Sequence, residues 1–173
     1  KLWVDDDGAQ TGAIGRIQEG VNGVLPGGSV EVLDGSFVDN VVIAKPLLLE
    51  GAGAALTAVV PALSAPNPPG CTGSLCDGSS HMILIQSSNV TVRGLTLDGN
   101  NPLLTSGVTS GGVDVDARNG IIEDYRVGTF DNTTVTNVTV KNVYLRGIYA
   151  SSSGSGFMFS GNAVDNVRGS GGS

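Results

Sequence analysis

The residues best suited to chemistry lie in the segment Gly112-Val-Asp-Val-Asp-Ala-Arg118, where two carboxylates and a guanidinium alternate with apolar residues. If the two valines face a core, the two-residue period of a β-strand places Asp114, Asp116 and Arg118 together on the outer face. Carboxylates spaced about 7 Å apart in this way suit Ca²⁺ or, with the guanidinium, an acidic sugar. They also suit general acid and base catalysis. A solvated strand face explains the same residues without any chemistry.

Two other segments offer single functional groups. In Asp124-Tyr-Arg126, Tyr125 provides a ring for sugar stacking and Arg126 a positive charge, although an exposed turn has the same composition. The only histidine, His81, borders a loop and precedes the apolar run Met82-Ile-Leu84, which favours a structural or surface role over a catalytic one. The chain has no Gly-x-Ser-x-Gly motif of the serine hydrolases.

The two cysteines, Cys71 and Cys76, lie in a segment rich in Pro and Gly, residues 61–78, which we expect to be a surface loop. A disulfide between them would stabilise the fold by at most about 2–3 kcal/mol and would indicate an oxidising compartment. Free thiols remain an alternative. A zinc site is disfavoured because the chain holds one histidine and no second cysteine pair.

The elements that must position these residues are short strands bent at Asn and Gly. In the run from Asn89 to Asn100, apolar residues alternate on either side of Arg93-Gly94, which indicates two strands joined at a corner. Val92, Val115 and Val138 recur at a spacing of 23 residues, close to one turn of a three-sided β-coil. The spacing of apolar residues over 13–24 predicts an amphipathic helix. We therefore predict a single all-β domain over residues 1–173, a three-sided solenoid capped by that helix.

Residues 13–53 carry a resemblance to a known family. The segment contains the helix, then Pro-Gly-Gly-Ser-Val-Glu-Val-Leu-Asp-Gly-Ser-Phe37, then Lys-Pro-Leu-Leu-Leu-Glu-Gly-Ala-Gly53. It resembles the N-terminal coil of right-handed parallel β-helix proteins of the pectin-lyase-like superfamily. The resemblance implies a right-handed parallel β-helix. It also implies Ca²⁺ held by acidic residues on an outer face and a basic residue that abstracts a proton. Arg118, Lys141 and Arg146 are the candidates for that catalytic base.

Charge and composition limit the partners. A net charge of −7 argues against a nucleic acid, and the scattered basic residues argue against an anionic membrane surface. We expect a secreted or cell-surface protein that binds or acts on a polysaccharide, with a polyuronate lyase or a glycoside hydrolase as the enzymatic possibility. A non-catalytic β-helix of an adhesin, surface layer or phage fibre is the alternative, and an ice-binding solenoid is the second.

The C-terminal segment lacks an evident cap. The chain runs to Arg168-Gly-Ser-Gly-Gly-Ser173 where a further strand would be expected, and an uncovered terminal strand presents unpaired backbone groups. We therefore expect either that these residues are the N-terminal portion of a longer protein, or that the uncapped C-terminal rung mediates end-to-end self-association.

Overall fold

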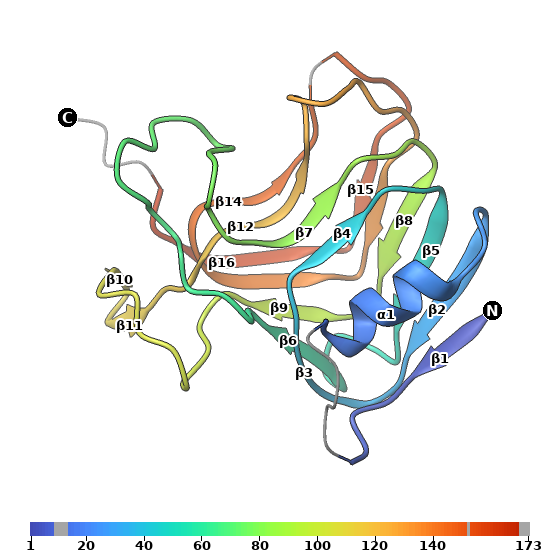
Figure 1. Cartoon of the computed structure of the whole chain (residues 1–173), viewed down its shortest axis with the longest axis horizontal. Helices are drawn as coiled ribbons and strands as arrows, with labels where there is room; N and C mark the ends of the chain where they lie inside the picture. Colours follow the sequence, from blue (N-terminus) through green and yellow to red (C-terminus); the bar gives the residue numbers. More distant parts are fainter. Residues whose placement is uncertain (9–13, 152, 170–173) are drawn as a thin grey trace.

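The computed structural model describes residues 1–8, 14–151 and 153–169, and its strands form two parallel sheets (Figure 1). All neighbouring strands of the first sheet, here called sheet A, are parallel. In spatial order they are β1 (Leu2–Val4), β2 (Gly28–Val32), β5 (Leu47–Gly51), β8 (Val90–Arg93), β13 (Thr134–Thr136) and β15 (Met158–Ser160).

The second sheet, sheet B, is a curled, parallel half-barrel (Figure 1). Its strands follow the order β3 (Gly35–Val38), β6 (Thr57–Val60), β9 (Thr96–Asp98), β14 (Thr139–Tyr149), β12 (Ala117–Glu123), β7 (His81–Ile85) and β4 (Val41–Ile43), and β16 (Ala163–Val167) also pairs with β14. Two short strands, β10 (Thr109–Ser110) and β11 (Val113–Asp114), form a separate antiparallel pair.

The core lies between the two sheets and is covered at one end by helix α1 (Arg16–Gly23). The helix buries Ile17, Gly20 and Val21, which recur at spacings of three and one on one face, and packs against β1, β2, β3 and β4. The predicted amphipathic helix is thus found, in a shorter form than 13–24; residue 13 lies outside the described residues. Among the described residues, no helix is both long and apolar enough to cross a membrane.

The prediction of a three-sided β-helix solenoid is wrong. The chain forms parallel sheet A, the curled half-barrel of sheet B and an antiparallel hairpin instead of three flat faces. The error arises from the expectation that short strands bend at Asn and Gly, because that expectation does not hold for Gly120 and Gly147. Both glycines lie inside long strands, β12 and β14. A Cβ at Gly120 would overlap Val140, and one at Gly147 would overlap Val164, so these glycines permit close packing and do not form corners.

The spacing of 23 residues between valines also has no structural counterpart. Val92 pairs with Leu49 on one side and Val135 on the other, each 43 residues away in sequence. Val115 is buried but lies outside the two sheets. The corner at Arg93-Gly94 is real, since Gly94 has a φ of +67°, a conformation that glycine adopts without steric cost.

Candidate functional site

The loop closed by the cysteines lies against the outer side of β12. The disulfide Cys71–Cys76 is present, as predicted. Arg118, at the start of β12, is only 2% exposed and donates hydrogen bonds to the carbonyl oxygens of Gly73 and Pro66 and to the side chain of Asn67. Burial lowers the pKa of Arg118. The predicted surface loop is therefore a fixed cover whose carbonyl groups are held by one buried guanidinium.

A ladder of polar side chains crosses three strands beneath this cover. His81 of β7, Asn119 of β12 and Arg146 of β14 occupy neighbouring register positions. Asn119 Nδ2 lies 3.0 Å from His81 Nδ1 and donates to the carbonyl oxygen of Ser74 at 2.8 Å. His81 Nε2 lies 3.2 Å from the hydroxyl of Ser79, which itself donates to the carbonyl of Cys76. Nδ1 is consequently the acceptor and Nε2 carries the proton.

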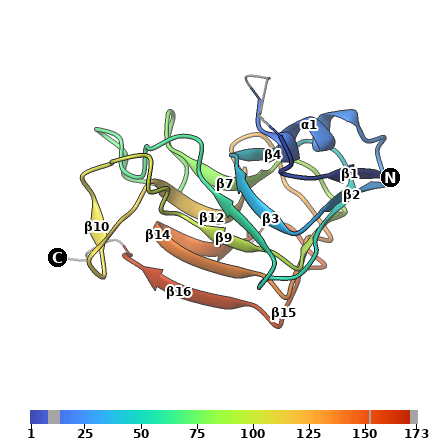
Figure 2. The ribbon, with the colours of Figure 1, turned by 90° about the horizontal axis from the view of Figure 1, so that it is seen from below.

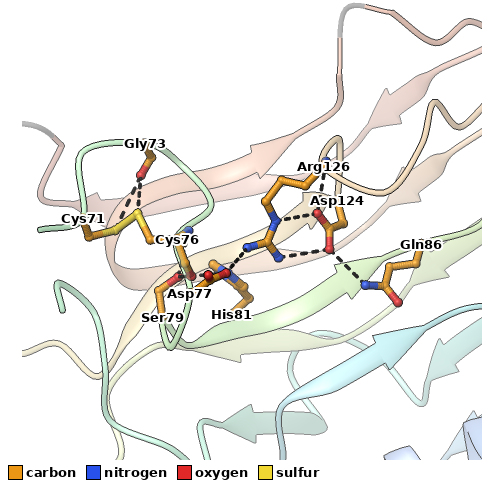
Figure 3. A network of polar contacts seen from close by, with 9 residues as sticks. All are labelled: Cys71, Gly73, Cys76, Asp77, Ser79, His81, Gln86, Asp124 and Arg126. Atoms are coloured by element: carbon orange, nitrogen blue, oxygen red, sulfur yellow. Dashed lines mark hydrogen bonds and ion pairs between the residues drawn. A yellow bond between two sulfur atoms is a disulfide. The ribbon is translucent and has the colours of Figure 1, made fainter.

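This environment keeps His81 neutral. Burial is the main cause that lowers the pKa of His81 to about 4, and the positive charges of Arg126 and Arg118 add to it. Arg126 belongs to a second polar group beside the ladder (Figure 3). Its Nε and Nη2 bond the two oxygens of the buried Asp124 at 2.8 and 3.1 Å, and its Nη1 lies 3.3 Å from Asp77. The bonds from Arg126 lower the pKa of the Asp124 carboxyl, which Gln86 also contacts.

Next to the cover, aromatic and basic residues gather in what we call the tyrosine–arginine surface. It consists of Tyr125, Tyr144, Tyr149, Arg118, Arg126, Arg146 and Arg168. The guanidinium carbons of Arg118 and Arg168 each lie 5.2 Å from the ring centre of Tyr144. That of Arg146 lies 5.7 Å from the ring of Tyr149, which meets Tyr125 edge-on at 6.3 Å. All three tyrosines and four of the six arginines of the chain thus share one region.

The charge of this region differs from that of the rest of the chain. Within the described residues, the ion pairs occupy Lys1, Arg16, Arg93, Arg126 and Lys141. Arg118, Arg146 and Arg168 form no ion pair there, and all three belong to the tyrosine–arginine surface. Arg146 is exposed and its Nε donates only a weak bond, 3.3 Å long, to the hydroxyl of Ser74. In a chain with a net charge of −7, the arginines without an ion pair in the described residues are therefore concentrated in one place. The remaining cation without an ion pair there, Lys45, donates to the carbonyl oxygens of Asn22 and Val24 beside α1.

The structure separates the residues that the sequence grouped as a site. Asp114, Asp116 and Arg118 do not share an outer strand face: Asp116 is fully buried and Arg118 nearly so. The Asp116 carboxylate accepts hydrogen bonds from the Ser64 hydroxyl and the Asn101 backbone, whereas Asp114 accepts from Ser106 and Gly107. The predicted shared face fails because the strand ends at Asp114 and the chain turns inward before β12 begins.

These contacts do not suit a calcium site. Asp114 accepts hydrogen bonds within its own loop, whereas Asp116 accepts from Ser64 of another loop and from Asn101, so the two carboxylates do not face a shared ion. In the part of the chain that the structure describes, no three Asp, Glu, His or Cys side chains converge as metal ligands.

Lys141 of β14, a candidate base, forms an ion pair with Asp98 of β9 at 3.1 Å. Of the predicted site residues, Arg118, Tyr125, Arg126 and Arg146 meet in the tyrosine–arginine surface.

A hollow of the molecular surface lies away from the tyrosine–arginine surface. It has a volume of about 520 Å³, lies at the carboxyl ends of the sheet A strands and is lined by Glu50, Arg93, Asn137 and the glycines between them. Its two charges are already paired, Arg93 Nη2 to Glu50 Oε2 at 2.7 Å. It also lacks an aromatic residue among its lining. The tyrosine–arginine surface, by contrast, presents unpaired charges and aromatic rings together.

Sequence reasoning missed three members of this surface. Tyr144 and Arg146 are two residues apart, so their strand period places them on the same face, and this signal was available. Tyr149 and Arg168 join the tyrosine–arginine surface only through the pairing of β14 with β12 and β16, which the sequence did not predict.

Comparisons with models of known protein families, with curated proteins and with solved structures find no match to this chain. The resemblance of residues 13–53 to pectin-lyase-like proteins therefore stays a prediction.

Proposed function

We propose that this protein binds an acidic polysaccharide through the tyrosine–arginine surface. One observation carries the proposal: Arg146 and Arg168, two exposed arginines without ion pairs in the described residues, lie together with every tyrosine of the chain. A guanidinium fork matches the geometry of a carboxylate, and a tyrosine ring offers an apolar face with a polar tip. Uronic acids combine both requirements, a carboxylate and a ring with apolar C–H groups.

Shape favours an extended polymer over a small molecule. Tyr144, Arg146 and Tyr149 follow one another along β14, and the span from Tyr144 to Tyr149 is about 16 Å at the rise of a β-strand. Arg126 is already neutralised by Asp124 and Asp77, so Arg146 and Arg168 are the charges available to a ligand. Arg118 is buried and acts as the support of the covering loop. Binding without catalysis matches the non-enzymatic alternative raised by the sequence.

The disulfide is compatible with an extracellular location, where a protein would meet such polymers. We place the protein outside the cell as part of the same proposal. The experiment below also tests for lyase activity.

The test compares binding to polygalacturonate and alginate with binding to an uncharged glucan and to a DNA oligomer, by calorimetry at two salt concentrations. Arg146→Ala is expected to weaken polyuronate binding about tenfold, because loss of one charge-assisted hydrogen bond costs about 1.5 kcal/mol. Arg93→Ala is the matched control, an exposed arginine of sheet A, and is expected to leave binding unchanged. Equal affinity for the glucan or the DNA, or an equal loss with Arg93→Ala, would refute the proposal. Unsaturated uronides detected by ultraviolet absorbance, with or without Ca²⁺, would show a lyase instead.

A further inference from the structure

The ring that the disulfide closes, residues 71–76, carries contacts that hold the covering loop on β12. The carbonyl oxygen of Gly73 accepts hydrogen bonds from Nε and Nη2 of Arg118, and the carbonyl oxygen of the next residue, Ser74, accepts from Asn119 at 2.8 Å. The loop lies beside β7 and β12, on the side of the molecule away from α1 (Figure 2). Two neighbouring carbonyl groups of one small ring thus meet two neighbouring side chains of β12.

The disulfide lies directly at this contact. The sulfur atoms of Cys71 and Cys76 are 3.9 and 3.4 Å from the Gly73 oxygen, the same oxygen that Arg118 binds (Figure 3). Closing the ring fixes this oxygen toward the guanidinium. Both cysteines are partly exposed, so a reductant can reach them.

The closed ring leaves two buried polar groups incompletely satisfied. Arg118 is 2% exposed, forms no ion pair among the described residues, and bonds only uncharged acceptors of the loop. A buried charge without an opposite charge is unfavourable. Asn119 is fully buried, and its Oδ1 has no hydrogen-bond partner within the described residues. A ligand with carboxylate and hydroxyl groups, such as a uronic acid, would supply what both groups lack.

The geometry of Arg118 suits an exchange of the ring for such a ligand. Nε and Nη2 form one edge of the guanidinium, and both are bonded to the single oxygen of Gly73. A carboxylate binds this edge with two oxygens. Nη1 bonds Pro66 and Asn67, which lie outside the ring and hold the side chain in place. Because the guanidinium carbon lies 5.2 Å from the ring centre of Tyr144, the freed edge would join the tyrosine–arginine surface.

We propose that the disulfide is a redox switch that withholds Arg118 from the tyrosine–arginine surface, and that its reduction increases the affinity of this surface for an acidic polysaccharide. The ligand class rests on the proposed function. A thiolate of a dithiol attacks one sulfur of the disulfide, which forms a mixed disulfide and releases the other cysteine. The second thiol of the reductant then closes its own disulfide and releases the first cysteine. The reductant loses two electrons, and the protein gains two thiols.

The first measurement is the accessibility of Arg118. Phenylglyoxal, an arginine-selective dicarbonyl, labels each arginine at a rate that mass spectrometry resolves. The comparison is between the wild type and Cys71→Ser/Cys76→Ser, which cannot close the ring and has no thiols to react. Arg118 is expected to be labelled about tenfold faster in the variant, because a disulfide favours a ring of this size by at least about that factor. Arg93, a partly exposed arginine of sheet A, is the control and should react equally in both proteins.

The second measurement is calorimetric binding to polygalacturonate. The wild type is titrated with and without dithiothreitol, and the serine variant under the same two conditions. Reduction is expected to tighten binding by the wild type about tenfold, because one more charge-assisted contact forms. The serine variant should bind like the reduced wild type and should not respond to dithiothreitol.

The two measurements separate the switch from the proposed function. Equal protection of Arg118 in both proteins would show that the loop stays in place without the disulfide, and would overturn the proposal. Faster labelling of Arg93 as well would show general unfolding and would also overturn it. So would equal or weaker binding by the reduced protein although Arg118 is labelled. If neither form binds polygalacturonate, the proposed function and the gain in affinity both fail, whereas the labelling still establishes the release of Arg118.

Discussion

Acidification is expected to destabilise this protein through its single histidine. His81 is 8% exposed, and its Nδ1 accepts a hydrogen bond from the Asn119 amide. A proton on Nδ1 would place two donors against each other, next to the positive charges of Arg126 and Arg118. The folded state therefore favours the neutral ring, whereas the unfolded chain protonates it near the usual pKa of 6.5.

The magnitude follows from the two pKa values. Because the pKa of His81 is lowered from 6.5 to about 4 on folding, its contribution to stability is present above about pH 6.5 and is lost as the pH falls toward 4. The expected loss between about pH 7.5 and about pH 4.5 is about 2.5 kcal/mol. Asp39 acts in the opposite direction, since burial raises the pKa of its carboxyl and the folded state then binds a proton more readily at low pH.

Urea denaturation at the two pH values, for the wild type and His81→Gln, measures this term. Glutamine does not titrate but keeps a hydrogen-bonding side chain at the position, and Asp39 contributes equally to both proteins. The wild type is expected to lose about 2.5 kcal/mol more than the variant. Equal losses would show that His81 is not held neutral by its surroundings, and the assignment of Nδ1 as an acceptor would then be wrong. The titration of the His81 ring protons by NMR provides a direct check.

Two further variants test the covering loop. Arg118→Met is expected to lower the free energy of unfolding, measured by urea denaturation, by about 3–5 kcal/mol, because several loop acceptors lose a charged donor. Lys141→Met, at a half-exposed ion pair, is the control and should lower it by less than about 1 kcal/mol. Similar values for the two variants would contradict the role of Arg118 as a support of the loop. Replacing Cys71 and Cys76 together by serine is expected to cost about 2 kcal/mol and to speed amide exchange in residues 66–79. A loss of protection throughout β12 would show instead that the disulfide stabilises sheet B itself.

Local patterns predicted the elements better than their assembly. The alternation at Val90 and Val92 correctly indicated a strand with one buried face, and both residues are fully buried. The helix was found because Ile17 and Val21 recur at the spacing of a helical face. Glycine was ambiguous: Gly94 forms a corner, but Gly120 and Gly147 lie within strands, and the difference depends on which side chain packs above each glycine. That information is not local, so the sequence suggested too many corners and the wrong fold.

The candidate site was predictable only in part for the same reason. Tyr125, Arg126 and Arg146 were recognised by residue type alone. Their association with Tyr149 depends on the register of β12 with β14, which includes an irregularity between Ala117 and Asn119. Asp116 was misplaced because its alternation with valines resembles a strand, although its carboxylate binds a neighbouring loop in the interior.

The parallel pairing of the sheets has a consequence for how the chain folds. A parallel pair requires a long connection, so that its two strands meet only after a large loop has closed. The pairs of Val92 with Leu49 and with Val135 are examples, since each joins residues that are 43 positions apart in the sequence. Among the described strands, only β10 and β11 pair as a local hairpin. Chains dominated by such distant contacts fold slowly, and the strands of sheet A that bind late leave their neighbours' edges exposed to other molecules in the meantime.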